Sequence, residues 1–126
     1  MKSKKENNDF SLKRRIKSFQ FAFEGFLSFF RTQPNAWIHL LAAILVCVAG
    51  FYYQLEKLEW FMIITAIALV FIVEMINTAI EFLCNKVEPS FDPQIKRIKD
   101  ISAAAVLFAA IIACVIGGVV FIPKFF

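Results

Sequence analysis

The chain has 126 residues, enough for one domain. Hydrophobic residues make up 60% of it, whereas soluble domains contain roughly 45–50%. A soluble domain of this size buries only about two-thirds of the surface that its unfolded chain exposes, so this composition favours a membrane protein. The formal net charge is +4, and the basic residues gather near the start of the chain. Outside the segments that we expect to contact lipid, no basic patch is interleaved with aromatic residues that could stack on bases. We therefore expect no nucleic-acid partner.

The N-terminal part predicts a polar, disordered tail over residues 1–10 and then a surface helix over residues 11–31. Apolar side chains recur there at alternating steps of four and three, which is typical of one helix face. They are Leu12, Ile16, Phe19, Phe23, Phe26 and Phe30. Basic residues crowd the early turns, so we expect an amphipathic helix that lies on anionic headgroups. The alternative is a helix on the surface of a soluble protein.

Three apolar segments follow, and each is close to the roughly 20 residues that cross a bilayer as a helix. Pro34 favours the first turn of a new helix. The predicted spans and connections are a span over 36–53, a turn over 54–59, a span over 58–85, a loop over 86–99 and a span over 100–122. At about 1.5 Å per residue the second span is longer than the ~30 Å hydrocarbon core, so its last turns should emerge into the interface. The predicted fold class is an all-α membrane protein with an amphipathic surface helix and three transmembrane helices.

The distribution of Lys and Arg predicts the topology. Eight lie before residue 32, one lies in 54–59, four lie in 86–99 and one follows Ile122. The positive-inside rule then places the N-terminus and the second loop in the cytoplasm.

The second span carries an unusual polar row, Glu74, Asn77 and Glu81. Steps of three and four residues put all three on one helix face, with the two carboxylates roughly 10 Å apart along the axis. The deeper Glu74 could accept a proton from a hydroxyl, while Glu81 and Asn77 could hold Mg²⁺, which takes one or two carboxylates and fills its shell with water and phosphate. The alternative is hydrogen bonding between helices, but ionisable residues in spans usually mark functional sites.

Other polar residues of the spans are harder to interpret. Lys99 would attract phosphate, and Asp100 at the predicted start of the third span is either a helix cap or a ligand. His39 is the only histidine, and we expect a packing or interfacial role for it because the sequence identifies no partner. No glycine-rich phosphate loop occurs, so carboxylates, metal and lysines would have to hold any nucleotide.

Two segments carry a resemblance to a known family. EMINTAIE (74–81) and KDISAAAVL (99–107) resemble the E-x-x-N-[ST]-A-I-E and K-D-x-x-[AS]-A-A-V-L signatures of the prokaryotic diacylglycerol kinase family, which includes undecaprenol kinases. RIKSFQFAFEGF (15–26) and NAWIHLLAA (35–43) look more like the undecaprenol kinase branch. The resemblance extends over about residues 11–120 and includes the order of the elements.

The resemblance implies a homotrimer in the bacterial cytoplasmic membrane, with active sites shared between subunits and residues 11–126 forming one integral membrane lipid-kinase domain. The γ-phosphate of MgATP would pass to a lipid hydroxyl, of undecaprenol or of diacylglycerol, with undecaprenol favoured. Glu74 would be the general base, and Glu81 and Asn77 would contact metal and phosphates. The further nucleotide contacts that the resemblance implies are Arg14, Lys17, Phe21, Gln33, Ser90, Phe91, Asp92, Lys99 and Asp100.

The chain departs from the family pattern at three positions. Gln33 stands where the family usually has a glutamate that binds metal, and an amide is an uncharged, weaker ligand. Asn85 replaces a frequent aspartate, and Asp92 replaces histidine or asparagine. Two alternatives therefore stay open: a member with altered catalysis (a lipid-phosphate phosphatase or an inactive protein), and a non-enzymatic helical membrane oligomer.

Overall fold

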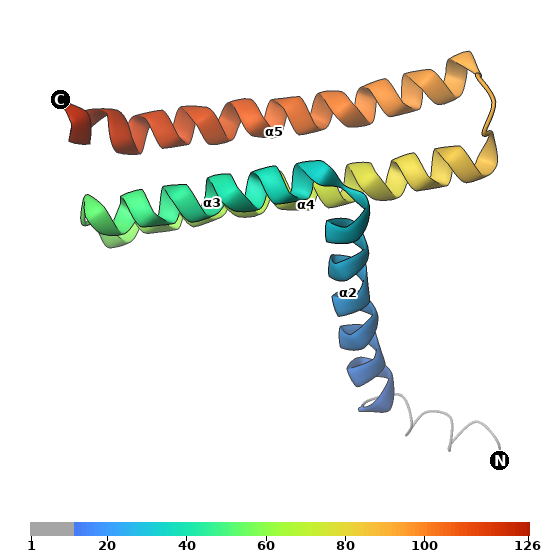
Figure 1. The fold of residues 1–126 in the computed structure, drawn as a ribbon, viewed down its shortest axis with the longest axis horizontal. Helices are drawn as coiled ribbons and strands as arrows, with labels where there is room; N and C mark the ends of the chain where they lie inside the picture. Colours follow the sequence, from blue (N-terminus) through green and yellow to red (C-terminus); the bar gives the residue numbers. More distant parts are fainter. Residues whose placement is uncertain (1–11) are drawn as a thin grey trace. The chain divides into compact units, whose positions relative to one another are not determined.

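The computed structural model describes residues 12–126, which form four α-helices and no strand (Figure 1). The helices are α2 (Lys13–Thr32), α3 (Pro34–Tyr52), α4 (Lys57–Val87) and α5 (Pro93–Phe125). One compact unit runs to Pro34 and contains α2, and a second begins at Asn35 and contains the other three helices. The predicted all-α fold is confirmed. The predicted tail over 1–10 lies outside the described residues, and the single domain over 11–126 stays a prediction.

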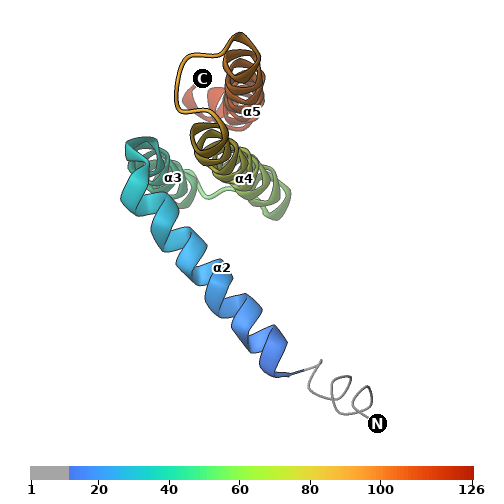
Figure 2. The same cartoon turned by 90° about the vertical axis from the view of Figure 1, so that its right-hand side faces the viewer.

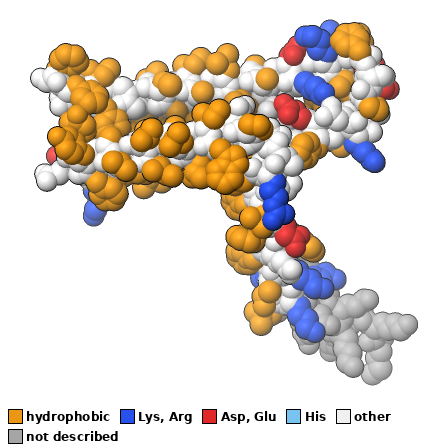
Figure 3. Space-filling model, in the orientation of Figure 1, with side chains coloured by type: hydrophobic (Ala, Val, Ile, Leu, Met, Phe, Trp, Pro, Cys, Tyr) orange, Lys and Arg blue, Asp and Glu red, His pale blue; other side chains and the backbone are white. Residues whose placement is uncertain are grey.

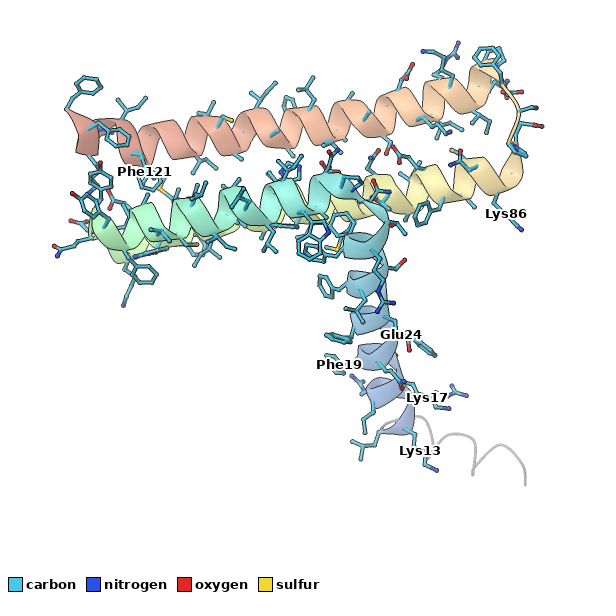
Figure 4. All side chains as sticks on the ribbon, viewed as in Figure 1. Lys13, Lys17, Phe19, Glu24, Lys86 and Phe121 are labelled. Atoms are coloured by element: carbon cyan, nitrogen blue, oxygen red, sulfur yellow. The ribbon has the colours of Figure 1, made fainter. Side chains whose placement is uncertain are left out.

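Helix α2 has an apolar side and a charged side, as its sequence pattern predicts. Phe19 projects from one side, whereas Lys13, Lys17 and Glu24 project from the other (Figure 4). Most of the apolar stripe is exposed, namely Leu12, Ile16, Phe19, Phe23 and Phe26. An exposed stripe of this kind suits a helix that lies in a membrane interface.

The end of α2 is set by the proline that follows it. A residue before proline is disfavoured in the helical region. Gln33 accordingly has extended backbone angles, φ −117° and ψ 107°, while its N–H donates to the carbonyl of Phe29. Gln33 is therefore a single-residue break between two helices.

Three helices are long and apolar enough to cross a membrane: α3 with 19 residues, α4 with 31 and α5 with 33. The first two agree closely with the predicted spans. Helix α4 lies between α3 and α5, and consecutive helices run antiparallel (Figures 1 and 2). Because α4 is much longer than α3, its C-terminal turns extend past the start of α3 and pack only against α5 within this unit (Figure 1).

The start of α5 differs from the prediction. We expected a loop over 86–99, but α5 already begins at Pro93. The Asp92 carboxylate accepts hydrogen bonds from the backbone N–H groups of Gln94 (2.8 Å) and Ile95 (3.1 Å). Proline fits the first helical position because its N–H would be unsatisfied there anyway. We considered Asp100 as a possible helix cap, but Asp92 caps this helix and Asp100 lies inside it.

The end of the unit that carries the α3–α4 turn and the C-terminus is held by apolar packing. Leu55, Ile63 and Val120 form a buried cluster, against which Trp60 and Phe121 pack. A Cβ atom at Gly50 would lie 2.7 Å from Cη2 of Trp60, so the indole needs a glycine there. This end joins all three helices through side-chain contact.

Candidate active site on helix α4

The polar row of α4 lies toward the end of the helix that carries the α4–α5 loop. Counted from Lys57, Glu74 is roughly 26 Å and Glu81 roughly 36 Å along the axis at 1.5 Å per residue. A hydrocarbon core of about 30 Å therefore ends between them when α4 enters it at its first turn. The Glu74 side chain is only 7% exposed, and Asn77 and Glu81 are half-buried.

Glu74 has a partner that the sequence did not reveal. The His39 Nε2 atom, on α3, lies 2.8 Å from the Glu74 Oε1 atom. The imidazole also makes an edge contact with the ring of Phe71, with centroids 6.3 Å apart. From the sequence we expected a packing or interfacial role for His39, because no partner could be identified there. A lone imidazole and a lone carboxylate in apolar spans were the available signal, because each needs a polar partner there.

Asn77 and Glu81 are brought together as their spacing predicts. The Asn77 Nδ2 donates to Glu81 Oε1 at 3.4 Å, and the Ser102 hydroxyl, on α5, donates to Asn77 Oδ1 at 2.7 Å. Ser102 is buried, and sequence reasoning gave it no role. The amide is thus held between its neighbour on α4 and a hydroxyl on α5.

The predicted nucleotide contacts on α5, Lys99 and Asp100, have partners of their own. Lys99 Nζ donates to Asn85 Oδ1 at 2.6 Å, one helical turn beyond Glu81. Lys96 Nζ and Asp100 Oδ2 form an exposed ion pair at 2.6 Å. Lys99 therefore lies next to the polar row of α4 that ends at Glu81. The roles of Lys99 and Asp100 toward a nucleotide stay predictions.

The α4–α5 loop contains three further predicted contacts. The N–H and hydroxyl of Ser90 both donate to Glu88 Oε1, and Phe91 is 80% exposed. Asp92 caps α5. Asp92 therefore has a structural task that is independent of any ligand.

Four predicted nucleotide contacts belong to the first unit. Arg14, Lys17 and Phe21 are exposed on α2, and Gln33 ends that helix. Their roles stay predictions.

The donor chemistry of the site can be compared with the needs of Mg²⁺. The described residues contain no group of three or more His, Cys, Asp and Glu side chains that could hold a metal ion. A carboxylate and an amide oxygen are nevertheless available from Glu81 and Asn77, and Mg²⁺ commonly keeps most of its shell as water and phosphate oxygens. The pair fits such a weakly held, substrate-borne ion better than a permanent metal centre.

Fold and site together define an integral membrane protein with a buried carboxylate and a half-buried polar row near one end of its spans. Comparison with known proteins identifies the class further. The sequence profile described as "Prokaryotic diacylglycerol kinase" matches residues 20–121. Undecaprenol kinase of Bacillus subtilis is 38% identical over 124 residues, which cover 98% of this chain and 99% of that protein.

Two diacylglycerol kinases are also similar. The protein of Synechocystis is 36% identical over 84% of this chain and 61% of its own length, and that of Escherichia coli K12 is 27% identical over 86% and 89%. The chain belongs to the prokaryotic diacylglycerol kinase family, and it is a membrane lipid kinase that takes its phosphate from ATP. The resemblance noted in the sequence is thereby confirmed. Neither alternative, a member with altered catalysis or a non-enzymatic oligomer, is favoured.

Proposed function

We propose that this kinase phosphorylates the terminal hydroxyl of undecaprenol. The similarity over nearly the whole length to the undecaprenol kinase of Bacillus subtilis supports this substrate over diacylglycerol. Diacylglycerol kinases are similar over less of this chain, at 36% and 27% identity. Diacylglycerol is the second candidate because the same family contains both activities.

The observation that carries the proposed chemistry is the buried Glu74 carboxylate, held at one oxygen by His39. A lipid hydroxyl near the headgroup boundary of the bilayer reaches a base only if the base lies at the same depth. Glu74 accepts the hydroxyl proton, the lipid oxygen forms a bond to the γ-phosphorus, and the bond from that phosphorus to the bridging oxygen of ADP breaks. The proton remains on Glu74 and later returns to water.

The remaining polar residues bind and orient the nucleotide in this proposal. Glu81 and Asn77 hold the Mg²⁺ that accompanies ATP, and Lys99 contacts phosphate. The ion supplies neutralisation of the charge that develops on the phosphates, which phosphoryl transfer needs more than covalent help. The remaining proposed nucleotide contacts are Arg14, Lys17, Phe21, Gln33, Ser90, Phe91, Asp92 and Asp100.

We also propose that the protein works as a homotrimer in the bacterial inner membrane, with its N-terminus in the cytoplasm. The lysines near the α4–α5 loop and on α2 support this orientation through the positive-inside rule. Large apolar side chains of α5, among them Leu107, Ile111 and Val115, are exposed in the single chain. They are available to contact lipid or neighbouring subunits.

The test is transfer of radiolabelled phosphate from ATP to undecaprenol and to diacylglycerol by purified protein in mixed micelles, with and without Mg²⁺. We expect Mg²⁺-dependent labelling of both lipids with at least tenfold higher kcat/KM for undecaprenol, about 1.4 kcal/mol of discrimination. Preference for diacylglycerol would overturn the proposed substrate. Transfer to neither lipid, or hydrolysis of the lipid phosphates, would overturn the kinase assignment.

A Q33E variant belongs in the same assay. A carboxylate at this position restores the charge that the family usually carries there. If Gln33 contacts the metal, the variant should reach half-maximal activity at a lower Mg²⁺ concentration. An unchanged Mg²⁺ dependence would remove Gln33 from the proposed metal ligands.

A further inference from the structure

The contact between α3 and α4 at His39 and Glu74 joins two residues that are 35 positions apart in the sequence. The two residues differ in their surroundings, since 27% of the His39 side chain is exposed but only 7% of the Glu74 side chain. Burial of a charged carboxylate costs several kcal/mol unless hydrogen bonds compensate for the lost water. The position of the histidine therefore decides whether the buried carboxylate has a hydrogen-bond partner.

The space beside this pair contains little else that could bind the carboxylate. His39 lines a cavity of about 330 Å³ between α3, α4 and α5. The other lining side chains are apolar, apart from the weakly polar thiol of Cys114; Ala42, Ala43, Val70 and Phe71 are among them. Thr78 is buried near Glu74, but its hydroxyl donates to the Glu74 backbone carbonyl and not to the carboxylate. Among the side-chain hydrogen bonds of the described residues, the one to the Glu74 carboxylate comes from His39.

We propose that His39 is a positioning residue for the proton transfer. This inference rests on the proposed role of Glu74 as the general base. The Nε2–H group donates to Oε1 of Glu74, which fixes the plane of the carboxylate and leaves Oε2 free to accept the proton of the lipid hydroxyl. The edge contact with Phe71 limits rotation of the imidazole in turn.

A purely structural tie between α3 and α4 makes different predictions. A contact that only holds the two helices together would affect stability and every kinetic constant alike. Any side chain of similar volume could then replace the histidine. A positioning residue instead acts on kcat, because it orients the base in the reacting complex and does not contact the bound substrates. The N–H donor, not the ring, is then the required feature.

Three variants separate these possibilities. H39L keeps apolar volume but has no donor. H39Q places an amide N–H near the position of the imidazole Nε2, and H39N carries the same amide on a side chain that is too short to reach. All three are compared with the unmodified protein for helicity, thermal stability and oligomeric state in the same detergent.

We expect H39L and H39N to lower kcat by about 10- to 100-fold, because misplacing a reacting group by 1 Å can cost about 100-fold. The KM values for ATP and lipid should stay within about twofold, and H39Q should recover most of kcat. Equal kcat values for H39L and H39Q, or a normal kcat for H39L, would overturn the proposal. If H39L does not fold, the comparison of H39Q with H39N decides the matter.

A second measurement does not depend on activity. His39 is the only histidine, so nitrogen NMR of uniformly labelled protein in micelles reports its tautomer without an assignment problem. We expect a proton on Nε2. A neutral ring with its proton on Nδ1 would show that His39 accepts from a protonated Glu74 and would overturn the proposal. Absence of kinase activity in the unmodified protein would overturn the proposed function, whereas the tautomer would still report on the contact.

Discussion

The two ends of the three-helix unit are built from different interactions. At the end with the α3–α4 turn, Leu55, Ile63 and Val120 are buried together and aromatic rings cover them. Toward the other end, hydrogen bonds between polar side chains connect the helices, between His39 and Glu74 and between Ser102 and Asn77. Charged side chains lie mainly toward this second end in the view of Figure 3.

We expect this difference to separate stability from chemistry within one short protein. Polar contacts between membrane helices average only about 0.6 kcal/mol, whereas truncation of a buried leucine costs about 2–5 kcal/mol. Substitutions at the apolar end should therefore change unfolding, and those at the polar end should change turnover. Four predictions test this separation.

The largest effect is expected for E74Q at the polar end. Glutamine keeps the size and the hydrogen-bonding oxygen of the side chain but cannot act as a base. We expect kcat to fall by about 10²–10⁴-fold, the usual contribution of a general base, with little change in thermal stability. The control is E59Q, the same substitution at the apolar end, where activity should be retained. Appreciable turnover by E74Q would show that Glu74 is not the base.

The next effect concerns Leu55 at the apolar end, which is 8% exposed. We expect L55A to lower the free energy of unfolding by about 2–5 kcal/mol, measured by SDS titration in mixed micelles. The kcat of the folded variant should stay within about twofold. Leu58 is 68% exposed, so L58A is the matched control and should change stability by about 0.5 kcal/mol or less. Loss of turnover in folded L55A would contradict the separation.

A smaller effect is expected for E81Q, which replaces the proposed metal ligand with a neutral one. The Mg²⁺ concentration for half-maximal activity should rise by about tenfold or more, since even indirect support of a metal is commonly worth 10–100-fold in affinity. Titration of activity against Mg²⁺ at fixed total ATP measures it, with E59Q as the control. An unchanged Mg²⁺ requirement would place the ion elsewhere.

The smallest effect is expected for the ion pair between Lys124 Nζ and Glu59 Oε1, 3.2 Å apart. Both side chains are about a quarter exposed, so solvent weakens their attraction. We expect K124M to cost about 1 kcal/mol or less and to leave turnover unchanged. A larger loss of unfolding free energy, again measured by SDS titration, would show that this pair contributes strongly to the stability of the apolar end.

Local patterns predicted most of the helices and the polar face of α4. Hydropathy gave α3 and α4 within about two residues, and the spacing of Asn77 and Glu81 gave their contact. The start of α5 was missed because aspartate followed by proline is common both in loops and at helix starts. Asp92 could be recognised as the cap only from its hydrogen bonds.

Contacts between helices could not be predicted in the same way. The pairing of His39 with Glu74 depends on how far α3 is shifted along α4, and no local pattern encodes that shift. The same holds for Ser102 with Asn77 and for Lys99 with Asn85. In each case the sequence showed a polar residue in need of a partner, and the packing of the helices selected which one it received.

From the length of α4 we expect the activity of the kinase to depend on the thickness of the membrane around it. A span that is longer than the hydrocarbon layer must tilt, thicken the layer locally or project from it. A thicker bilayer would draw Glu81 and Asn77 into acyl chains and away from the nucleotide, while a thinner one would expose Glu74 to water. Acyl-chain length in reconstituted vesicles should thus tune turnover with an optimum, because the proposed mechanism needs the two carboxylates on opposite sides of one boundary.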